Sequence, residues 1–401
     1  MYRKFAIAGL SILVLVGCSS LPRQHAVPKQ LTTQAVVPLD INEVRYLVDA
    51  PDDMRRMSRD AAALWPKELA WQVAQGKSGK ALAPSNMLAI SGGGDNGAYT
   101  AGLLNGWSAA GTRPEFSLVT GVSTGALIAP YAFLGSKHDA QLKALYTETP
   151  REQLIEIRNV FAVLTEDSVI DTAPLFNLIS TQIDRAFLDK IAIEYEKGRT
   201  LLISTTNLDT RQKVIWNMTK IAASQDPRAL SLFHRIMLAS AAIPGAFPPV
   251  MIDVEVKGQM FSEMHVDGGT TGQVFVYPPS LNLGALAKEN GGERKRSLFV
   301  IMNERMDPEW AETERRVLTI AGRSIATLIH HQGMSDLFRV FLTTQRDKVA
   351  FNLSYIPSDF DHPDAGTFNN DFMRALYARG YKEATQGGNF WQHFPPGYTI
   401  E

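Results

Sequence analysis

The chain has 401 residues, of which 45% are hydrophobic, so it is long enough and apolar enough to bury one large core. Its formal net charge is -1, its isoelectric point is about 6.7, and it has no long basic run. This balance excludes the electrostatic footprint of a nucleic-acid-binding protein and any polybasic attraction to anionic lipid.

The N-terminus is predicted to be a signal peptide over residues 1–17. A short positive region is followed by an apolar run over residues 5–16 that is too short to span a bilayer comfortably. The run ends at Cys18, and Leu15-Val16-Gly17-Cys18 resembles the lipobox of bacterial lipoproteins, in which the cysteine becomes the lipidated mature N-terminus. An ordinary cleaved signal with an incidental cysteine is the alternative.

Two consequences follow for the location of the protein. Cys18 is the only cysteine, so no disulfide can form. We expect a lipid anchor in the bacterial cell envelope. In lipoproteins of this kind a serine after the cysteine, here Ser19, usually accompanies the outer membrane, which is therefore the expected site.

Four segments are expected along the chain. Residues 18–39 are polar and contain three prolines, which predicts a flexible tether after the signal peptide. Residues 40–85 are predicted to be an N-terminal helical extension, with helices over 41–48 and 53–75. From residue 86, short apolar runs alternate with helical segments, which predicts an α/β fold with a mostly parallel central sheet in one domain over 86–394.

The expected strands and helices alternate through this domain. Strands are predicted at 87–90, 116–120, 201–204, 214–216, 298–302 and 349–355, and a hairpin at 251–256 and 260–266. Helices are predicted at 98–110, 126–134, 228–241, 308–344 and 369–385. Between residues 139 and 198 the pattern predicts amphipathic helices at 141–146, 151–161 and 173–191. These form either a lipid-facing cap or ordinary crossover helices.

The sequence Gly121-Val122-Ser123-Thr124-Gly125 is a G-x-S-x-G motif between an apolar run and a helical segment. Such a turn can expose a serine hydroxyl at a sharp strand-to-helix bend, as in a nucleophile elbow. Glycines suit the flanking positions because a side chain there would clash with the crossing strand and helix. Ser123 is therefore a candidate nucleophile, and a turn with an incidental serine is the alternative.

A glycine-rich loop, residues 92–97, also lies between an apolar strand and a helix. Its backbone N–H groups and the helix N-terminus can stabilise a phosphate or a developing oxyanion. Read as G-x-G-x-x-G it also matches a dinucleotide fingerprint, but the acidic residue required at the end of the next strand is missing, because Glu115 precedes that strand.

The third candidate is Asp267, followed by Gly268 and Gly269, at the end of an alternating apolar run. An aspartate released by two glycines at a strand end can point into a crevice there. The common alternative is an ordinary turn.

Together the three sites, in this chain order, resemble the patatin-like phospholipase family. The segment Ala239-Ser240-Ala241-Ala242-Ile243-Pro244-Gly245 is also similar to the S-x-A-x-P segment of that family. The resemblance covers about residues 86–267 by motif and implies a three-layer α/β/α fold. The chain departs from the family at Asn96, where the loop often carries a basic residue, which makes a phospholipid preference less secure than ester hydrolysis.

The resemblance implies a Ser–Asp dyad, with Ser123 as nucleophile and Asp267 as general base and acid. Lipid acyl hydrolysis of the phospholipase A or lysophospholipase type is expected, on a lipid ester or phospholipid at the membrane, with no metal, cofactor or nucleic acid. The implied oxyanion hole consists of Gly92, Gly93, Gly94 and Asp95. The implied motif glycines are Gly97, Gly121, Gly125, Gly268 and Gly269.

Two alternatives remain open. A Ser–His–Asp esterase would need a histidine after the serine, and the candidates are His265, His330, His331, His362 and His393. A non-catalytic envelope lipoprotein that binds lipid or a partner is the other.

Overall fold

The computed structural model describes residues 23–398, apart from residues 24, 42, 80, 158–166, 290–293, 363–366 and 387–389. The predicted signal peptide over residues 1–17 and the lipidation site Cys18 lie outside the described residues. The predicted anchor therefore stays a prediction.

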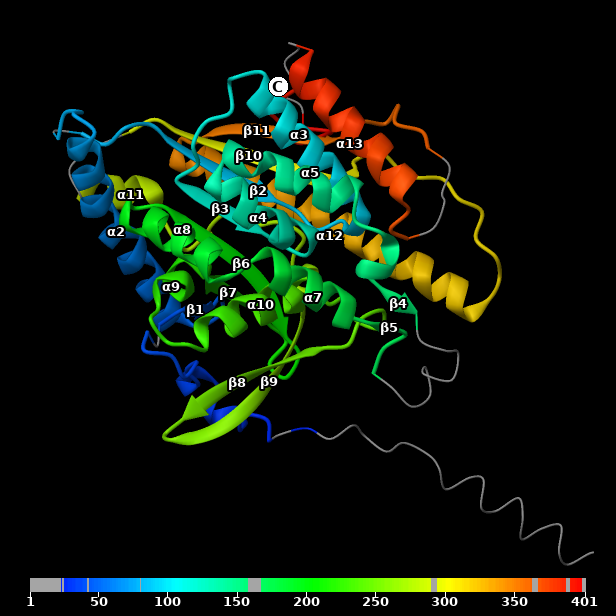
Figure 1. Cartoon of the computed structure of the whole chain (residues 1–401), viewed down its shortest axis with the longest axis horizontal. Coiled ribbons are helices and arrows are strands. Elements are labelled where there is room, and N and C mark those ends of the chain that lie inside the picture. Colours follow the sequence, from blue (N-terminus) through cyan, green and yellow to red (C-terminus); the bar gives the residue numbers. More distant parts are fainter. Residues whose placement is uncertain are drawn as a thin grey trace, which may run out of the picture.

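A nine-stranded mixed sheet forms the centre of the described chain (Figure 1). Its order is β1-β7-β6-β3-β2-β10-β11, and the hairpin β8-β9 joins it through β9 and β6. The five strands from β6 to β11 run parallel, and β1, β7 and β9 pair antiparallel with their neighbours. The strands are β1 (Arg45–Leu47), β2 (Ser85–Ile90), β3 (Leu118–Gly121), β6 (Thr200–Asn207), β7 (Gln212–Asn217), β8 (Val250–Val256), β9 (Gln259–Asp267), β10 (Arg296–Arg305) and β11 (Ala350–Ile356).

Helices surround this sheet, and a small second sheet pairs β4 (Glu156–Ile157) with β5 (Ile170–Asp171). The α-helices are α2 (Pro51–Ala74), α3 (Gly97–Ala109), α4 (Thr124–Leu134), α5 (Asp139–Thr147), α7 (Ala173–Gln182), α8 (Arg185–Glu196), α9 (Met218–Ala223), α10 (Ala229–Ser240), α11 (Leu283–Glu289), α12 (Val317–Asp347) and α13 (Asn370–Thr385). The short 3₁₀ helices are η1 (Lys29–Gln34), η2 (Gly94–Asn96), η3 (Ser136–His138), η4 (Arg151–Gln153) and η5 (Gly268–Thr270).

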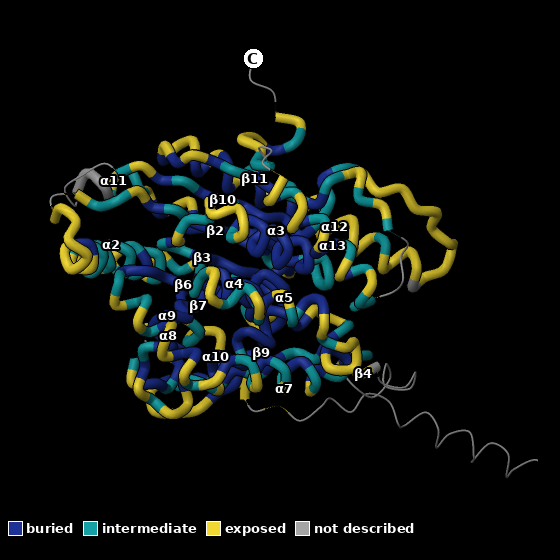
Figure 2. The backbone as a smooth tube through the Cα atoms, turned by 45° about the horizontal axis from the view of Figure 1, so that its top comes forward, coloured by how far each residue is buried: buried dark blue, intermediate teal, exposed yellow. Residues whose placement is uncertain are grey.

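Both faces of the central strands are buried, which explains their continuous apolar runs. On β2, Leu88 and Ile90 belong to a core cluster that includes buried residues of α3, α4 and α13. Met87 and Ala89 point to the other face and pack in a cluster with residues of α12 such as Leu337. Figure 2 shows the central strands and α3 as the most deeply buried part of the tube. The predicted α/β fold with a mostly parallel central sheet is confirmed.

The predicted helix over residues 41–48 is wrong, because the segment contains strand β1. β1 extends the sheet antiparallel to β7, with Arg45 opposite Trp216, and all three of its side chains are buried. Pairing with a distant strand overrides the local pattern here. The extension over residues 40–85 is therefore not wholly helical, although α2 fills most of it.

The flexible tether predicted for residues 18–39 is also wrong over its described part. Val27, Val37 and Leu39 are buried, and the backbone of Val36 exchanges hydrogen bonds of 3.0 and 2.8 Å with Glu255 on β8. The guanidinium of Arg23 forms an ion pair with Asp209. The prolines predicted flexibility, but the apolar residues between them pack against the hairpin β8-β9.

Three other boundaries differ from the prediction. The described part of the predicted helix 151–161 is η4 followed by strand β4. The predicted helix 173–191 is two helices, because the Asp184 carboxylate accepts a 2.8 Å hydrogen bond from the N–H of Phe187 and caps α8. The helix predicted from residue 308 begins only at Val317.

The predicted hairpin turn is confirmed, with Lys257 and Gly258 at φ of 53° and 80°.

Candidate active site

The turn between β3 and α4 places Ser123 in a backbone conformation that non-glycine residues rarely adopt. Its φ is 54° and its ψ is -125°. The flanking glycines are required by close approach: a Cβ on Gly121 would lie 2.4 Å from the carbonyl oxygen of Gly125, and a Cβ on Gly125 would lie 2.4 Å from that of Ile90. The strand, the strained serine and the helix together have the geometry of a nucleophile elbow.

Asp267 lies at the end of β9, directly beside this serine. The Ser123 hydroxyl donates a 2.6 Å hydrogen bond to Asp267 Oδ2, and the N–H of Gly269 donates a 2.6 Å bond to Oδ1. Both side chains are buried. Burial raises the pKa of Asp267 to about 7, against the opposing effect of the hydrogen bonds from Ser123 and Gly269. The carboxylate can therefore both accept and return a proton near neutral pH.

Ser240, at the end of α10, holds the backbone of the candidate nucleophile. Its hydroxyl oxygen accepts a 3.1 Å bond from the N–H of Ser123 and donates a 2.8 Å bond to the carbonyl of Ser204 on β6. The sequence motif around Ser240 does not reveal this role, because the hydrogen-bond partners of Ser240 are more than thirty residues away in the chain. The Ser123 N–H is thereby unavailable as an oxyanion donor.

The glycine-rich loop offers backbone donors beside Ser123. Within the described residues, the N–H groups of Gly93 and Gly94 have no acceptor, and Gly94 lines the pocket that contains Ser123. Gly93 has φ of 146°, and a Cβ there would lie 2.3 Å from the carbonyl oxygen of Asn303. The helix α3 begins at Gly97 directly after the loop, so its positive dipole end also lies here.

Gly92 does not fit the predicted oxyanion role. Its N–H donates a 3.1 Å hydrogen bond to the carbonyl of Gln273 and so is already used. What Gly92 contributes is space, because a Cβ there would lie 3.2 Å from the Cβ of Ser123. Sequence spacing could not distinguish this glycine from its neighbours, because Gln273 lies far along the chain.

The remaining predicted motif residues have structural positions around the same point. The Asp95 carboxylate accepts a 2.9 Å bond from the N–H of Phe368 and connects the loop to the segment before α13. A Cβ on Gly97 would lie 2.3 Å from Thr124 Oγ1, and one on Gly268 would lie 2.4 Å from the carbonyl oxygen of Ser204. These glycines let α3, α4 and the turn after β9 converge.

Asn303 on β10 is a positioning residue that the sequence analysis missed. Its N–H donates to the Ser91 hydroxyl at 2.8 Å and its side-chain amide donates to the Ser91 carbonyl at 3.0 Å. Its side-chain oxygen accepts a 2.6 Å bond from Thr100 on α3. Asn303 therefore fixes the start of the glycine-rich loop. The one feature of the sequence that could have indicated this role is that Asn303 is an amide residue near the end of an apolar strand.

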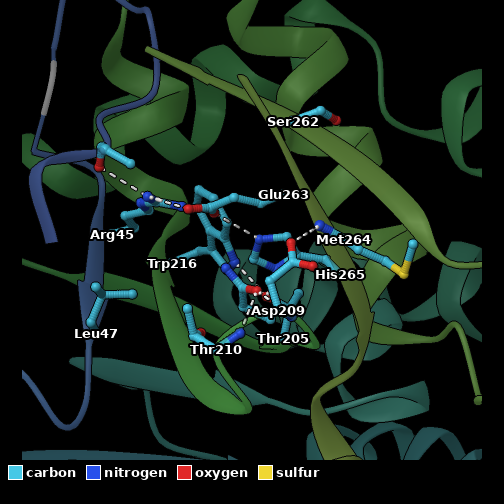
Figure 3. Close-up of polar contacts among 12 residues, drawn as sticks. Arg45, Leu47, Thr205, Asp209, Thr210, Trp216, Ser262, Glu263, Met264 and His265 are labelled. Atoms are coloured by element: carbon cyan, nitrogen blue, oxygen red, sulfur yellow. Dashed lines mark hydrogen bonds and ion pairs between the residues drawn. The ribbon is translucent and has the colours of Figure 1, made fainter. Parts of the chain in front are cut away.

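His265 belongs to a buried polar network rather than to the dyad (Figure 3). The indole N–H of Trp216 donates to Thr205 Oγ1 at 2.8 Å, and because Nε2 of the neutral His265 ring faces a carboxylate, its Nδ1 accepts a 2.8 Å hydrogen bond from the Thr205 hydroxyl. His265 Nε2 then donates to Glu263 at 3.1 Å, and the Glu263 carboxylate is also paired with Arg45. Burial lowers the pKa of His265 and keeps it neutral.

The other candidate histidines also lie in contacts away from Ser123. His330 Nδ1 is 2.8 Å from Glu304, and the His331 ring packs on that of His330. His393 Nδ1 is 3.2 Å from the carbonyl of Phe351, and the His362 ring lies against Phe360 and Phe372. Among the described residues, Asp267 is the hydrogen-bond partner of the Ser123 hydroxyl. The geometry therefore favours the Ser–Asp dyad over a Ser–His–Asp triad.

An apolar pocket opens beside Ser123. Helix α7, within the segment predicted to be either a cap or crossover helices, supplies one wall of it. Gln182 is the one amide side chain among walls that are otherwise mainly apolar. The lining residues include Leu127, Tyr131, Leu145, Leu154, Ile155, Leu175, Leu178, Ile179, Met237, Ile243, Phe247 and Met373.

A second, polar cleft lies across the glycine-rich loop from the apolar pocket. Gly93 and Asn96 line it from the loop, and Glu304 and His330 line it from β10 and α12. Burial raises the pKa of Glu304 to about 7. Asn96, the position that departs from the family pattern, therefore faces a polar environment rather than the apolar pocket.

No set of three or more histidine, cysteine or acidic side chains in the described residues is arranged to hold a metal ion. Over the same residues, no helix combines the length and apolarity that crossing a bilayer requires.

Three solved structures are similar to this chain at low identity. VipD from Legionella pneumophila is 11% identical, with 79% of this chain and 68% of that chain covered and a TM-score of 0.38. ExoU from Pseudomonas aeruginosa, in complex with SpcU, is 13% identical, with 76% and 52% covered and a TM-score of 0.35. Human group IVD cytosolic phospholipase A2 is 11% identical, with 73% and 52% covered and a TM-score of 0.29. The chain thus spans about half the length of the last two.

A comparison with curated proteins finds no match. Residues 88–278 match the family model described as "Patatin-like phospholipase", a range that contains the glycine-rich loop, Ser123 and Asp267. The matched segment, a little under half of the chain, is thus similar to the patatin-like phospholipases, a family of serine ester hydrolases.

Proposed function

We propose that this protein hydrolyses the acyl esters of membrane lipids, with Ser123 as the nucleophile and Asp267 as its general base and acid. The observation that carries the proposal is the 2.6 Å hydrogen bond between the two side chains, of which Ser123 lines an apolar pocket. Phospholipase A or lysophospholipase activity is the form of the reaction that we propose.

In the proposed reaction, Ser123 Oγ attacks the acyl carbonyl carbon while its proton moves to Asp267 Oδ2. The N–H groups of Gly93, Gly94 and Asp95 stabilise the negative oxygen that forms. When the intermediate collapses, the leaving alcohol takes the proton from Asp267 and the acyl group stays on Ser123. A water molecule, activated by the same carboxylate, then releases the fatty acid and restores the serine.

The two cavities on either side of the glycine-rich loop support a lipid as the substrate. The acyl chain is proposed to occupy the apolar pocket, whose lining side chains are almost all hydrocarbon. The polar part of the lipid is proposed to lie toward the cleft lined by Asn96, Glu304 and His330. This cleft holds paired charges of both signs, so it favours a head group that forms hydrogen bonds over one that needs a single strong cation.

Filling the apolar pocket is expected to shorten the acyl chain that the enzyme accepts. Ile179 on α7 is buried and lines the pocket, so Ile179→Trp places an indole where the chain is proposed to lie. We expect kcat/KM for a C12 p-nitrophenyl ester to fall by about tenfold or more, because several methylenes of the acyl chain can no longer be buried and their binding free energy is lost. The butyrate ester should be hydrolysed at close to the normal rate.

The matched control is Ile193→Trp, the same change at an exposed isoleucine of α8. It should leave the chain-length profile unchanged. If Ile179→Trp melts at the normal temperature but loses the same fraction of kcat/KM on the butyrate and the C12 ester, the acyl chain does not lie in this pocket.

We also propose that Cys18 is lipidated and anchors the enzyme in the bacterial envelope, at the outer membrane. Because residues 25–39 pack on the body, only residues 19–22 separate Cys18 from the ion pair of Arg23 with Asp209. Such a link spans about 17 Å at most. Cys18→Ser is expected to move the protein from the membrane fraction to the soluble fraction without changing its activity on a soluble ester. Fractionation with immunoblotting checks this, and an unchanged distribution would refute the anchor.

A further inference from the structure

A third cavity lies on the sheet at the end opposite to the active site. Ser85 at the start of β2, Leu118 at the start of β3 and Thr200 at the start of β6 line it, whereas Ser123 and Asp267 follow the carboxyl ends of their strands. The cavity has about 120 Å³ of accessible volume, compared with about 90 Å³ for the pocket beside Ser123. Nothing in the proposed reaction uses it.

The walls of this cavity are largely apolar. The floor is formed by side chains of β2, β3 and β6, and the roof by α2 and the segment around α11. The apolar lining residues are Met57, Leu64, Trp65, Met87, Leu118, Leu202, Val276, Leu281 and Leu283. From β10 to β6 the floor crosses three strand spacings, about 14 Å, which suits an extended alkyl chain.

One end of the cavity carries an arginine that has no direct partner in the described part of the chain. Arg296, the first residue of β10, lines the cavity with only 9% of its surface exposed, and in the described part of the chain no hydrogen bond or ion pair satisfies its guanidinium. The guanidinium nitrogens remain accessible and are therefore free to bind an anion. Burial, and then the nearby Arg294, lower the pKa of Arg296, and Tyr277, Asp347 and Glu68 oppose that lowering.

The other charged groups of the cavity are already paired with one another. Arg294 donates to Glu68 at 2.6 Å, and Lys220 donates to Asp60 at 2.7 Å. Arg294 Nε is also buried without a partner. The residual charge is therefore positive and lies at the β10 end, next to the apolar floor.

We propose that this cavity binds an amphiphile with one anionic head group and an alkyl tail, with the head group on Arg296 and the tail along the floor of β2, β3 and β6. A fatty acid, the product of the proposed reaction, and a lysophosphatidate, with its phosphate, share this chemistry. The proposal rests on the cavity and its unpaired arginine, so it stands whether or not Ser123 acts on lipids.

The test is binding of radiolabelled oleate to the full chain carrying Ser123→Ala, measured by equilibrium dialysis below the aggregation concentration of the lipid. Adding Arg296→Gln should remove one bound equivalent or weaken it by at least about tenfold, because a charge-assisted hydrogen bond is lost. Oleyl alcohol, with the same tail and no charge, should bind equally to both proteins. Parallel titration with oleoyl lysophosphatidate identifies the preferred head group, and tighter binding of either lipid supports the site.

Lys295→Gln is the matched control, because it removes the same charge from an exposed side chain one residue earlier. It should not change oleate binding. Without lipid, Arg296→Gln should melt close to the temperature of its parent, since the substitution removes no hydrogen bond or ion pair of the described residues, and oleate should no longer raise that temperature. Unchanged oleate binding in Arg296→Gln, or an equal loss in Lys295→Gln, would overturn the proposal.

Discussion

Ser123→Ala is expected to lower kcat/KM for ester hydrolysis by about 10⁴-fold or more while leaving the fold intact. The hydroxyl is the only group that the substitution removes, and among the described residues it donates to Asp267. The strained backbone at φ of 54° is unchanged, because alanine tolerates it no better than serine. Hydrolysis of p-nitrophenyl esters and mass spectrometry of a membrane lipid extract measure the effect.

The control for this variant is Ser335→Ala, at an exposed serine of α12. It should keep full activity and full labelling by a fluorophosphonate probe, whereas Ser123→Ala should lose both. Fatty acid release by Ser123→Ala at the normal rate would show that another residue attacks the ester. If the probe labels the normal protein but the protein hydrolyses no lipid, its substrates are esters other than lipids.

Asp267→Asn is expected to lower kcat by about 10³-fold, because general base catalysis by the carboxylate is lost while the shape of the site is kept. In the normal enzyme the pKa of Asp267 is raised to about 7 by burial. The reactive form is the ionised carboxylate, so kcat/KM should rise with pH through about 7 and then level off. A profile that is flat between pH 5 and pH 9 would contradict the assignment of the base.

The same shift makes a prediction about stability with the opposite sign. The pKa of Asp267 is about 7 in the folded chain, and an unfolded aspartate has a pKa near 3.9, so the folded state holds more protons between these values. The free energy of unfolding therefore decreases as the pH rises from about 4 to about 7. Asp267→Asn should abolish this decrease and unfold less readily at pH 8, by at most about 4 kcal/mol.

Urea unfolding of both proteins at pH 5 and pH 8 measures this difference. The control is Asp253→Asn on the neighbouring strand β8, whose carboxylate is half-exposed and lies 3.2 Å from Arg235. Asp253→Asn should leave kcat unchanged, and its free energy of unfolding should vary with pH as that of the normal protein does. An Asp267→Asn variant that is less stable than the normal protein at pH 8 would mean that the carboxylate has a structural role.

The parts of the site that could be predicted from sequence are those that depend on local backbone geometry. A glycine two residues before and after Ser123 and two glycines after Asp267 are needed wherever such turns cross other elements, so they leave a pattern in the chain. The order of the three motifs then indicated the family. The candidate nucleophile Ser123, the aspartate hydrogen-bonded to it and the apolar strands around them could all be predicted in this way.

What could not be predicted depends on partners far along the chain. The N–H of Gly92 is used by Gln273, and Ser123 is held by Ser240, which is 117 positions away. His265 stands two positions before Asp267 and was a reasonable candidate base, yet Thr205 and Glu263 occupy both of its nitrogens. Local patterns give no information on such contacts, because the pairing of strands decides them.

The packing of the N-terminal segment on the hairpin β8-β9 has a consequence for when this protein can fold. Val36 pairs with Glu255, and Arg45 pairs with Glu263, 218 positions later. Val36 and the Arg45 guanidinium therefore lack these partners until about two thirds of the chain has been made. Contacts of such long sequence separation slow folding. A slow-folding chain stays unfolded for longer, which is what passage through a narrow membrane channel before assembly would require.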